Sequence, residues 1–233
     1  MMKRFFVLLL GIGLGVFSYG SGAVTVAAFG DSITRGWPYD KDDADGIPNN
    51  GGYVPTLQSK LNAVGWGATV LNYGYPGEFV TSGVNRIRPQ DYSAAVLKSK
   101  PDYVLAMEGT NDLSWYVGWA TIRDSLATIV SYVKEGDSVP LLGTLLPRGG
   151  YVNEQVLLTN DAIRQLAKDE DVVLADLYYA DDSNWSGLIN SDKIHPNYAG
   201  YALMADTGFS ALQEATKPDD PVLEPILYLL LSE

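Results

Sequence analysis

The single histidine of this chain lies in a segment whose residue types suit acid–base chemistry. His195 follows Asp192 by three residues, in a run that reads Asp-Lys-Ile-His-Pro. An imidazole can take up and return a proton near neutral pH. A carboxylate three residues away is close enough to orient its ring. Because the chain has only 1 histidine, any imidazole-based catalysis must use His195.

A serine near the other end of the chain could supply a nucleophile. Ser32 comes directly after an apolar run, in the segment 29–34, which reads Phe-Gly-Asp-Ser-Ile-Thr. A serine hydroxyl is a weak nucleophile until a neighbouring base removes its proton. With His195 as the base and Asp192 holding the other ring nitrogen, the three residues have the composition of a nucleophilic acyl-transfer site.

Two further segments carry groups that could stabilise a tetrahedral intermediate. Gly77 follows the second apolar run of the body, and Asn111 follows the third, in a segment that reads Gly-Thr-Asn-Asp. The backbone N–H groups of Ser32 and Gly77 and the side-chain amide of Asn111 are suitable donors for an oxyanion. Glycine at position 77 also lets the backbone approach closely and adopt unusual dihedral angles.

Each of these residues alone also has an ordinary structural interpretation. Ser32 could cap a helix, and Gly77 and Asn111 could be turn residues. The segment from Asp192 to His195 could be a surface ion pair or a cap. The joint pattern favours a site, because every group follows a different predicted strand.

The periodicity of the sequence predicts where these groups lie. Short apolar runs predict five strands, at 24–29, 68–71, 102–107, 139–145 and 172–175. Apolar residues at helical spacing, together with one further helical segment, predict helices at 53–64, 122–133, 152–168 and 198–212. Alternating strands and helices imply right-handed βαβ units and a parallel sheet with helices on both faces. Sites in such sheets form outside the carboxyl ends of the strands, where all four segments should converge.

At these residues the chain resembles the SGNH hydrolases, also called the GDSL esterase/lipase family. The segment 29–34 is similar to the family's first block, Gly77 to the glycine of the second, 109–112 to the third and 192–195 to the last. The first block often reads Gly-Asp-Ser-Leu, and Ile33 stands here in place of the leucine. The resemblance covers residues 24–212, which is the whole body of the chain.

The resemblance implies an α/β fold, a flavodoxin-like three-layer α/β/α sandwich with a five-stranded parallel sheet. It implies Ser32 as nucleophile, His195 as base, Asp192 as the acid of the triad, and an oxyanion hole formed by Ser32, Gly77 and Asn111. It also implies catalysis without a metal or an organic cofactor. The Gly-x-Ser-x-Gly nucleophile elbow of the larger α/β-hydrolases is absent around Ser32.

The two ends of the chain differ from its body. Residues 1–22 combine Lys3 and Arg4 with a short apolar run and small residues, which predicts a secretory signal peptide. An uncleaved anchor is the alternative, although the run is short for a membrane span. We therefore expect a secreted or periplasmic protein whose mature chain is not stably inserted in a membrane. Residues 23–216 form the predicted SGNH hydrolase domain, and residues 217–233 form a C-terminal tail of unknown role.

Composition limits the fold type and the partners. A hydrophobic content of 46% suits one globular domain, and the absence of cysteine excludes disulfides and thiolate sites. A net charge of -12 argues against nucleic acid as a partner. The acidic segment 40–46 lacks the spacing of an EF-hand, because Ala44 and Gly51 hold two of its ligand positions. We expect that segment to be a solvated loop.

The sequence therefore predicts an exported serine esterase or lipase that cleaves a small-molecule or glycan ester through an acyl-enzyme. A carbohydrate acetylesterase and a non-catalytic glycan-binding module stay open as alternatives, as does the oligomeric state. Several aromatic residues near the predicted site could line an acyl-chain pocket or stack on a sugar. They are Trp37, Tyr39, Tyr75, Phe79, Trp115, Tyr116, Trp119 and Trp185.

Overall fold

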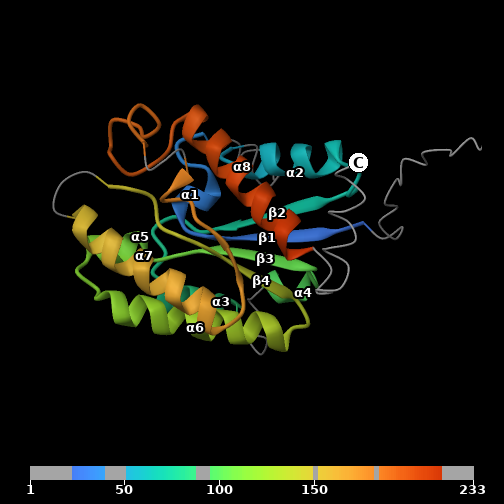
Figure 1. Ribbon diagram of the computed structural model, residues 1–233, viewed down its shortest axis with the longest axis horizontal. Coiled ribbons are helices and arrows are strands. Elements are labelled where there is room, and N and C mark those ends of the chain that lie inside the picture. The colour runs from blue at the N-terminus through green and yellow to red at the C-terminus, as the bar shows by residue number, and fades with distance from the viewer. Residues whose placement is uncertain (1–22, 40–50, 88–94, 149–151, 181–183, 217–233) are drawn as a thin grey trace, which may run out of the picture.

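Five parallel strands form the sheet of the protein, in the order β2-β1-β3-β4-β5. The computed structural model describes residues 23–39, 51–87, 95–148, 152–180 and 184–216 (Figure 1). Its strands are β1 (Thr25–Gly30), β2 (Thr69–Gly74), β3 (Tyr103–Met107), β4 (Val139–Gly143) and β5 (Val173–Ala175). This order is that of a flavodoxin-like sheet, in which the connection reverses direction beside β1. The expected five-stranded parallel sheet is therefore confirmed.

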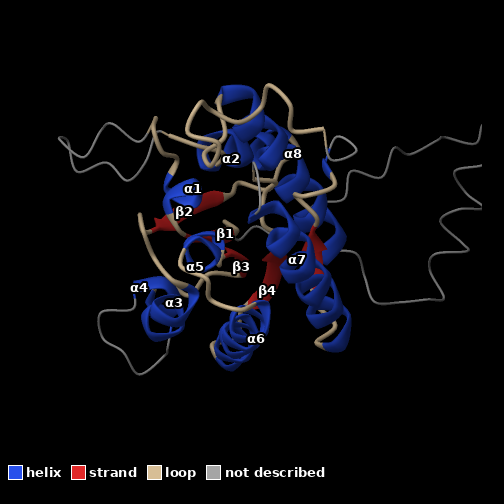
Figure 2. Ribbon diagram, turned by 90° about the vertical axis from the view of Figure 1, so that its left-hand side faces the viewer, coloured by secondary structure: helices blue, strands red, loops and turns tan. Residues whose placement is uncertain are grey.

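Helices cover both faces of this sheet. They are α1 (Ser32–Arg35), α2 (Val54–Ala63), α3 (Val80–Ile87), α4 (Ala95–Lys98), α5 (Thr110–Ser114), α6 (Trp119–Glu135), α7 (Val152–Asp169) and α8 (Tyr198–Ala215). Figure 2 shows α2 and α8 on one face, and α3 and α6 on the other. Helix α7 packs against α6 and completes the second layer. The result is the three-layer sandwich that the sequence predicted.

The middle of the sheet explains why β1 reads as an unbroken apolar run. Its residues from Val26 to Phe29 are fully buried, because β2 and β3 flank the strand and helices cover both of its faces. Gly30 at its end is in register with Gly74 of β2 and Met107 of β3. The carboxyl ends of these three strands therefore lie side by side, and the loops that follow them meet at one edge.

The sequence predicted the long helices within a few residues of their bounds, but it missed α1, α3, α4 and α5. Three of these have four or five residues, too few to show a helical period. Helix α3 is longer, but its buried face includes Gly83. The ring of Phe29 lies 3.4 Å from the place of a Cβ there, so a small residue fits this face where an apolar one would be expected.

Three predicted segments lie outside the described residues. They are the signal peptide at 1–22, the acidic segment at 40–46 and the tail at 217–233. Within the described ranges, none of the helices combines the length and the apolar character needed to cross a bilayer.

Candidate active site

Ser32 is the first residue of α1, directly after β1. The preceding Asp31 caps this short helix, since its Oδ1 accepts the backbone N–H of Ile33 at 2.8 Å. Gly74 at the end of β2 packs so closely against α1 that a Cβ there would collide with the backbone of Arg35. The turn from β1 into α1 is thus fixed from both sides, and it holds Ser32 at the carboxyl edge of the sheet.

His195 reaches Ser32 from the loop that precedes α8. Its Nε2 lies 2.8 Å from Ser32 Oγ, and its Nδ1 lies 2.8 Å from Asp192 Oδ2. The other oxygen of Asp192 accepts the backbone N–H groups of Ile194 and His195, at 2.9 and 3.0 Å. One carboxylate therefore shapes the loop and orients the ring. With the ring proton on Nδ1, Nε2 is free to accept the serine proton.

Asn190 closes this loop, and the sequence analysis did not identify it. Its backbone N–H donates to the carbonyl of His195 at 2.8 Å, and its side-chain amide donates to the carbonyl of Pro196 at 2.8 Å. We call residues 189–196 the histidine loop, because Ile189 and Pro196 also form an isolated antiparallel bridge across its base. An asparagine five residues before a histidine is too weak a pattern to predict this closure.

The carboxylate of Asp192 is held in its charged form. Burial opposes ionisation, but the N–H groups of His195 and Ile194, followed by the imidazole of His195, outweigh this cost and place the pKa of Asp192 below its ordinary value. Its side chain is 38% exposed. Asp192 is therefore negative at neutral pH, as an orienting partner of imidazole must be.

Gly77 and Asn111 follow the two strands that flank β1. Gly77 has a φ of 77°, a left-handed conformation that favours glycine, and it has open space around its Cβ position. Asn111 stands in the first turn of α5, and its Nδ2 donates to the carbonyl of Glu78 at 2.9 Å. This bond ties α5 to the loop that carries Gly77. Because an amide has two N–H groups, Asn111 has a second one that this bond does not use.

A group of largely buried ionisable side chains includes Asp31, the residue before Ser32, and the sequence predicted no role for it. We call it the buried acidic wall. It comprises four carboxyls, each at most 6% exposed, and one guanidinium: Asp31, Glu78, Glu108, Asp112 and Arg86. The sequence contains a signal for two of these residues. Asp31 directly follows β1 and Glu108 directly follows β3, at the sheet edge where sites form.

Arg86 of α3 connects the parts of this wall. Its Nε donates to both carboxylate oxygens of Glu78, at 2.8 and 3.0 Å, and its Nη2 donates to the carbonyl of Gly30 at 3.3 Å. The guanidinium also lies 4.4 Å over the ring of Phe29 and 4.0 Å from Glu108. Arg86 thereby joins the end of β1 to the loop after β2.

Burial controls the protonation of this wall. The pKa of Asp31 is raised to about 7, chiefly by burial and also by the negative charges of Glu78 and Asp112, while the Ile33 N–H opposes the rise. Burial also raises the pKa of Glu108 well above its usual range, and the negative charges of Asp31 and Glu78 add to this effect. Arg86 offsets only part of it. The wall therefore holds protonated carboxyls at pH values where Asp192 is charged.

The aromatic residues expected near the site divide into two groups. Trp185 is buried, and Tyr39 stacks on Tyr198 with ring centroids 3.8 Å apart. Trp37, Tyr75, Trp115, Tyr116 and Trp119 are exposed. The indole of Trp37 lies 6.3 Å from the His195 ring, centroid to centroid. Phe79 packs near Trp115, at 6.4 Å. Exposed rings therefore occur in the segments that follow β1, β2 and β3.

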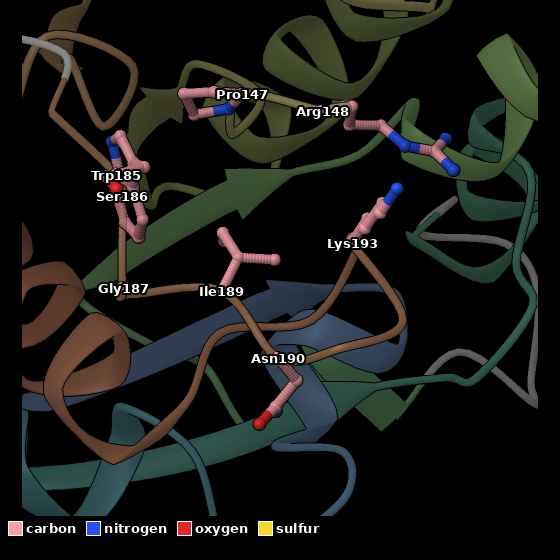
Figure 3. Close-up of a pocket in the computed structure, with 8 residues that line it drawn as sticks. All are labelled: Pro147, Arg148, Trp185, Ser186, Gly187, Ile189, Asn190 and Lys193. Carbon is pink, nitrogen blue, oxygen red and sulfur yellow. The ribbon is translucent and has the colours of Figure 1, made fainter. Parts of the chain in front are cut away.

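A cavity of about 310 Å³ adjoins the histidine loop. Its lining, drawn in Figure 3, combines an apolar floor with two basic side chains. The residues are Pro147, Arg148, Trp185, Ser186, Gly187, Ile189, Asn190 and Lys193. Of these residues, only Trp185 was expected near the site from the sequence.

Known proteins resemble this chain in both sequence and structure. Esterase TesA of Pseudomonas aeruginosa is 25% identical over 192 residues, which cover 82% of this chain and 89% of TesA. The uncharacterized lipoprotein YqeF of Bacillus subtilis is 30% identical over 152 residues, 63% of this chain and 58% of YqeF. The crystal structure of Axe2, an acetylxylan esterase from Geobacillus stearothermophilus, matches with a TM-score of 0.67 at 22% identity. That match covers 82% of this chain and 95% of Axe2.

A protein-family model also matches most of the chain. The model of the GDSL-like lipase/acylhydrolase family covers residues 28–203, from β1 into α8. That range contains all the segments from which the sequence analysis built its site. The chain belongs to the GDSL-like lipase/acylhydrolase family and is a carboxylic ester hydrolase.

Proposed function

We propose that this enzyme cleaves its ester through an acyl-enzyme on Ser32, with His195 as general base and Asp192 as the group that orients it. The observation that supports this most is the continuous hydrogen-bonded chain from Ser32 Oγ through both nitrogens of His195 to Asp192, with 2.8 Å at each step. A nucleophile, a base and an orienting carboxylate in this order are what acyl transfer requires.

Acylation begins when His195 Nε2 takes the proton of Ser32 and the oxygen attacks the ester carbonyl. The carbonyl oxygen then becomes an oxyanion, which the N–H groups of Ser32, Gly77 and Asn111 stabilise. The imidazolium is stabilised by the charged Asp192 and returns its proton to the departing alkoxide. The alcohol leaves, and the acyl group remains on Ser32.

Deacylation repeats the same steps with water as the nucleophile. His195 takes a proton from the water, the hydroxide attacks the acyl carbon, and the same donors hold the second oxyanion. The proton then returns to Ser32 Oγ as the acid departs. This cycle consumes one ester and one water and leaves the enzyme unchanged.

Replacing Ser32 with alanine tests the proposal. Ser32→Ala should keep its fold by circular dichroism and lose ester turnover by about 10⁴-fold or more, because the covalent route is gone. An organophosphate should add one group to the wild-type protein, located at Ser32 by mass spectrometry, and none to the variant. Turnover by folded Ser32→Ala at the wild-type rate would contradict the proposal.

A carbohydrate acetylesterase is the second candidate, and the exposed aromatic rings favour it. Trp115 and Tyr116 follow α5 and are 73% and 87% exposed, so they can stack on a sugar. Axe2, which has a similar fold, is described as an acetylxylan esterase. Rates on p-nitrophenyl esters from acetate to palmitate, compared with acetate release from acetylated xylan, separate the two. The non-catalytic binding module is not retained, because the chain is an ester hydrolase.

We also propose that the enzyme is exported, to the periplasm or the medium. The basic and apolar N-terminal segment supports this, and the relative YqeF is named a lipoprotein, a description compatible with a place outside the cytoplasm. Mass spectrometry of the exported fraction should give an N-terminus near residues 21–24. An intact Met1 in membrane-bound protein would indicate an anchor instead.

A further inference from the structure

The cavity beside the histidine loop has two basic side chains and no acidic one in its lining. Arg148 comes from the loop after β4, and Lys193 comes from the histidine loop. Pro147, Trp185 and Ile189 supply apolar wall. The volume, about 310 Å³, is at the lower end of the range for small-molecule sites. A chain with a net charge of -12 thus presents a locally positive cavity next to its proposed base.

Arg148 is anchored beside the oxyanion-hole segment. Its Nη1 donates to the carbonyl of Thr110 at 3.1 Å and to Ser114 Oγ at 2.7 Å, so α5 holds the guanidinium in place. Burial lowers its pKa, while the negative charges of Asp31 and Asp192 oppose that effect. The guanidinium has five N–H groups. It can therefore keep its contacts to α5 and still donate to a ligand.

Lys193 occupies a position that suits glycine. Its φ is 62°, in the left-handed region, where a lysine is strained and a glycine is not. Such conformations at non-glycine residues cluster at functional sites. The residue stands between Asp192 and His195, so its side chain is placed by the loop that carries the base. Figure 3 shows its ammonium directed toward the guanidinium of Arg148.

Asp192, the carboxylate of the histidine loop, already has hydrogen-bond partners within that loop. Asp192 binds the ring of His195 and two backbone N–H groups, so its oxygens are occupied by the site itself. The negative charge of Asp192 attracts Arg148, but Asp192 is not among the residues that line the cavity. Two cations that face one cavity repel each other unless an anion lies between them. The cavity is therefore suited to a negatively charged group.

We propose that this cavity binds a carboxylate on the alcohol part of the ester, between Lys193 and Arg148, so that the enzyme favours anionic over neutral leaving groups. The alcohol part is assigned because His195 must protonate the departing alkoxide, and the cavity is lined by the loop that carries His195. This specificity rests on the proposed function, since it uses His195 as the acid of that step.

The test compares two acetate esters that differ in charge on the leaving group. The measured quantity is the ratio of kcat/KM for p-acetoxybenzoate to kcat/KM for p-acetoxybenzamide. Lys193→Gly should lower this ratio about fivefold to tenfold, because an ion pair is lost, and Lys193→Arg should keep it. Lys168→Gln is the matched control, since it removes one charge from the exposed end of α7, at the opposite edge of the sheet. Its ratio should equal that of the wild type.

Two further measurements sharpen the result. The melting temperature of Lys193→Gly should be no lower than that of the wild type, because glycine relieves the left-handed strain. Added sodium chloride should weaken the preference for p-acetoxybenzoate in the wild type more than in Lys193→Gly. A lower melting temperature would contradict the strain argument, and an equal salt effect would contradict the ion pair.

An acyl-side pair of esters tests the assigned direction. The ratio for mono-p-nitrophenyl adipate against p-nitrophenyl hexanoate should change less in Lys193→Gly than the leaving-group ratio does. A larger change there would overturn the assignment to the alcohol part. A leaving-group ratio that does not fall in Lys193→Gly, or that falls equally in Lys168→Gln, would overturn the site. Failure of the wild type to hydrolyse both neutral esters would instead contradict the proposed function.

Discussion

The buried acidic wall and the histidine loop both adjoin Ser32, and their carboxyls are stabilised in opposite ways. In the wall, burial raises the pKa of Asp31 and Glu108, with Arg86 as the one cation inside the group. In the loop, N–H donors keep the pKa of Asp192 low despite partial burial. The site therefore contains acidic groups that tend to be neutral and one that stays charged.

This difference in ionisation matches the roles that we propose for the loop and the wall. In the proposed mechanism Asp192 is negative when it orients the imidazole and stabilises the imidazolium. Two backbone N–H groups donate to one of its oxygens, and they favour this charged form. The wall has to fix the backbone at the ends of β1 and β2, and a protonated or paired carboxyl can do so without solvent. We expect changes in the loop to affect turnover most, and changes in the wall to affect stability as well.

The largest effect should follow from removing the base of the loop. His195→Gln should lower kcat by about 10⁴- to 10⁶-fold. Asp192→Asn should lower it by about 10³- to 10⁴-fold, because the amide favours the wrong tautomer of the ring. Steady-state kinetics on p-nitrophenyl acetate measures both, and urea unfolding checks that both variants are folded.

The double variant provides the control for that prediction. If Asp192 acts only through His195, then His195→Gln combined with Asp192→Asn should be no slower than His195→Gln alone. If the loss of kcat in the double variant equals the product of the two single losses, Asp192 contributes by another route. A folded His195→Gln enzyme with the wild-type rate would contradict the role of His195.

An intermediate effect should follow from cutting the wall at Arg86. Arg86→Met should lower kcat by about 10- to 100-fold, because the loop of Gly77 and Glu78 loses its tie to Gly30. It should also lower the free energy of unfolding by about 3–5 kcal/mol, because Glu78 is left as an unpaired buried charge. Kinetics and urea unfolding on the same preparation measure both quantities.

A second variant distinguishes the effect of Arg86 on the position of the Gly77 loop from its effect on folding stability. Arg86→Met combined with Glu78→Gln removes both charges, so much of the lost stability should return while kcat stays low. Arg86→Lys keeps the charge without the planar fork and should fall between wild type and Arg86→Met in kcat. Recovery of kcat in parallel with stability would mean that Arg86 acts only on the fold.

The same comparison shows what the sequence could predict. The three triad candidates were identified because their patterns are local: Asp192 and His195 are three residues apart, and Ser32 follows a recognisable buried strand. The strands and long helices were predicted for a similar reason, since apolar periodicity is a local signal. The hydrogen bond between Ser32 and His195 is distant in sequence, but the topology of parallel strands brings its two segments to one edge.

The buried acidic wall was missed because its contacts have no local pattern. Arg86 and Glu78 are eight residues apart, while Glu108 directly follows the next strand of the chain, β3. Their meeting depends on how α3 crosses the face of the sheet, which the spacing of charges does not reveal. The same holds for Arg148, whose contact with Ser114 joins the loop after β4 to the end of α5, 34 residues earlier. Charged residues in loops look solvated in a sequence, and only packing shows which are buried.

The smallest effect should be on the pH dependence of stability, to which Asp31 of the wall and Asp192 of the loop contribute with opposite signs. Asp31 has a pKa of about 7 in the folded protein against 3.8 for an ordinary aspartate, so the native state binds more protons than the unfolded state between these values. Stability must then fall as pH rises from about 4 to 7, by at most about 4 kcal/mol from this group. Asp192 has a lowered pKa, so its contribution is present above about pH 4 and is lost only at lower pH. Asp31→Asn should therefore flatten the fall in unfolding free energy between about pH 4.5 and 7.5, while Asp192→Asn should leave that fall unchanged. Urea unfolding of the three proteins across this range measures the slopes, and an Asp31→Asn slope equal to that of the wild type would mean that Asp31 in the folded protein is already ionised at pH 4.5.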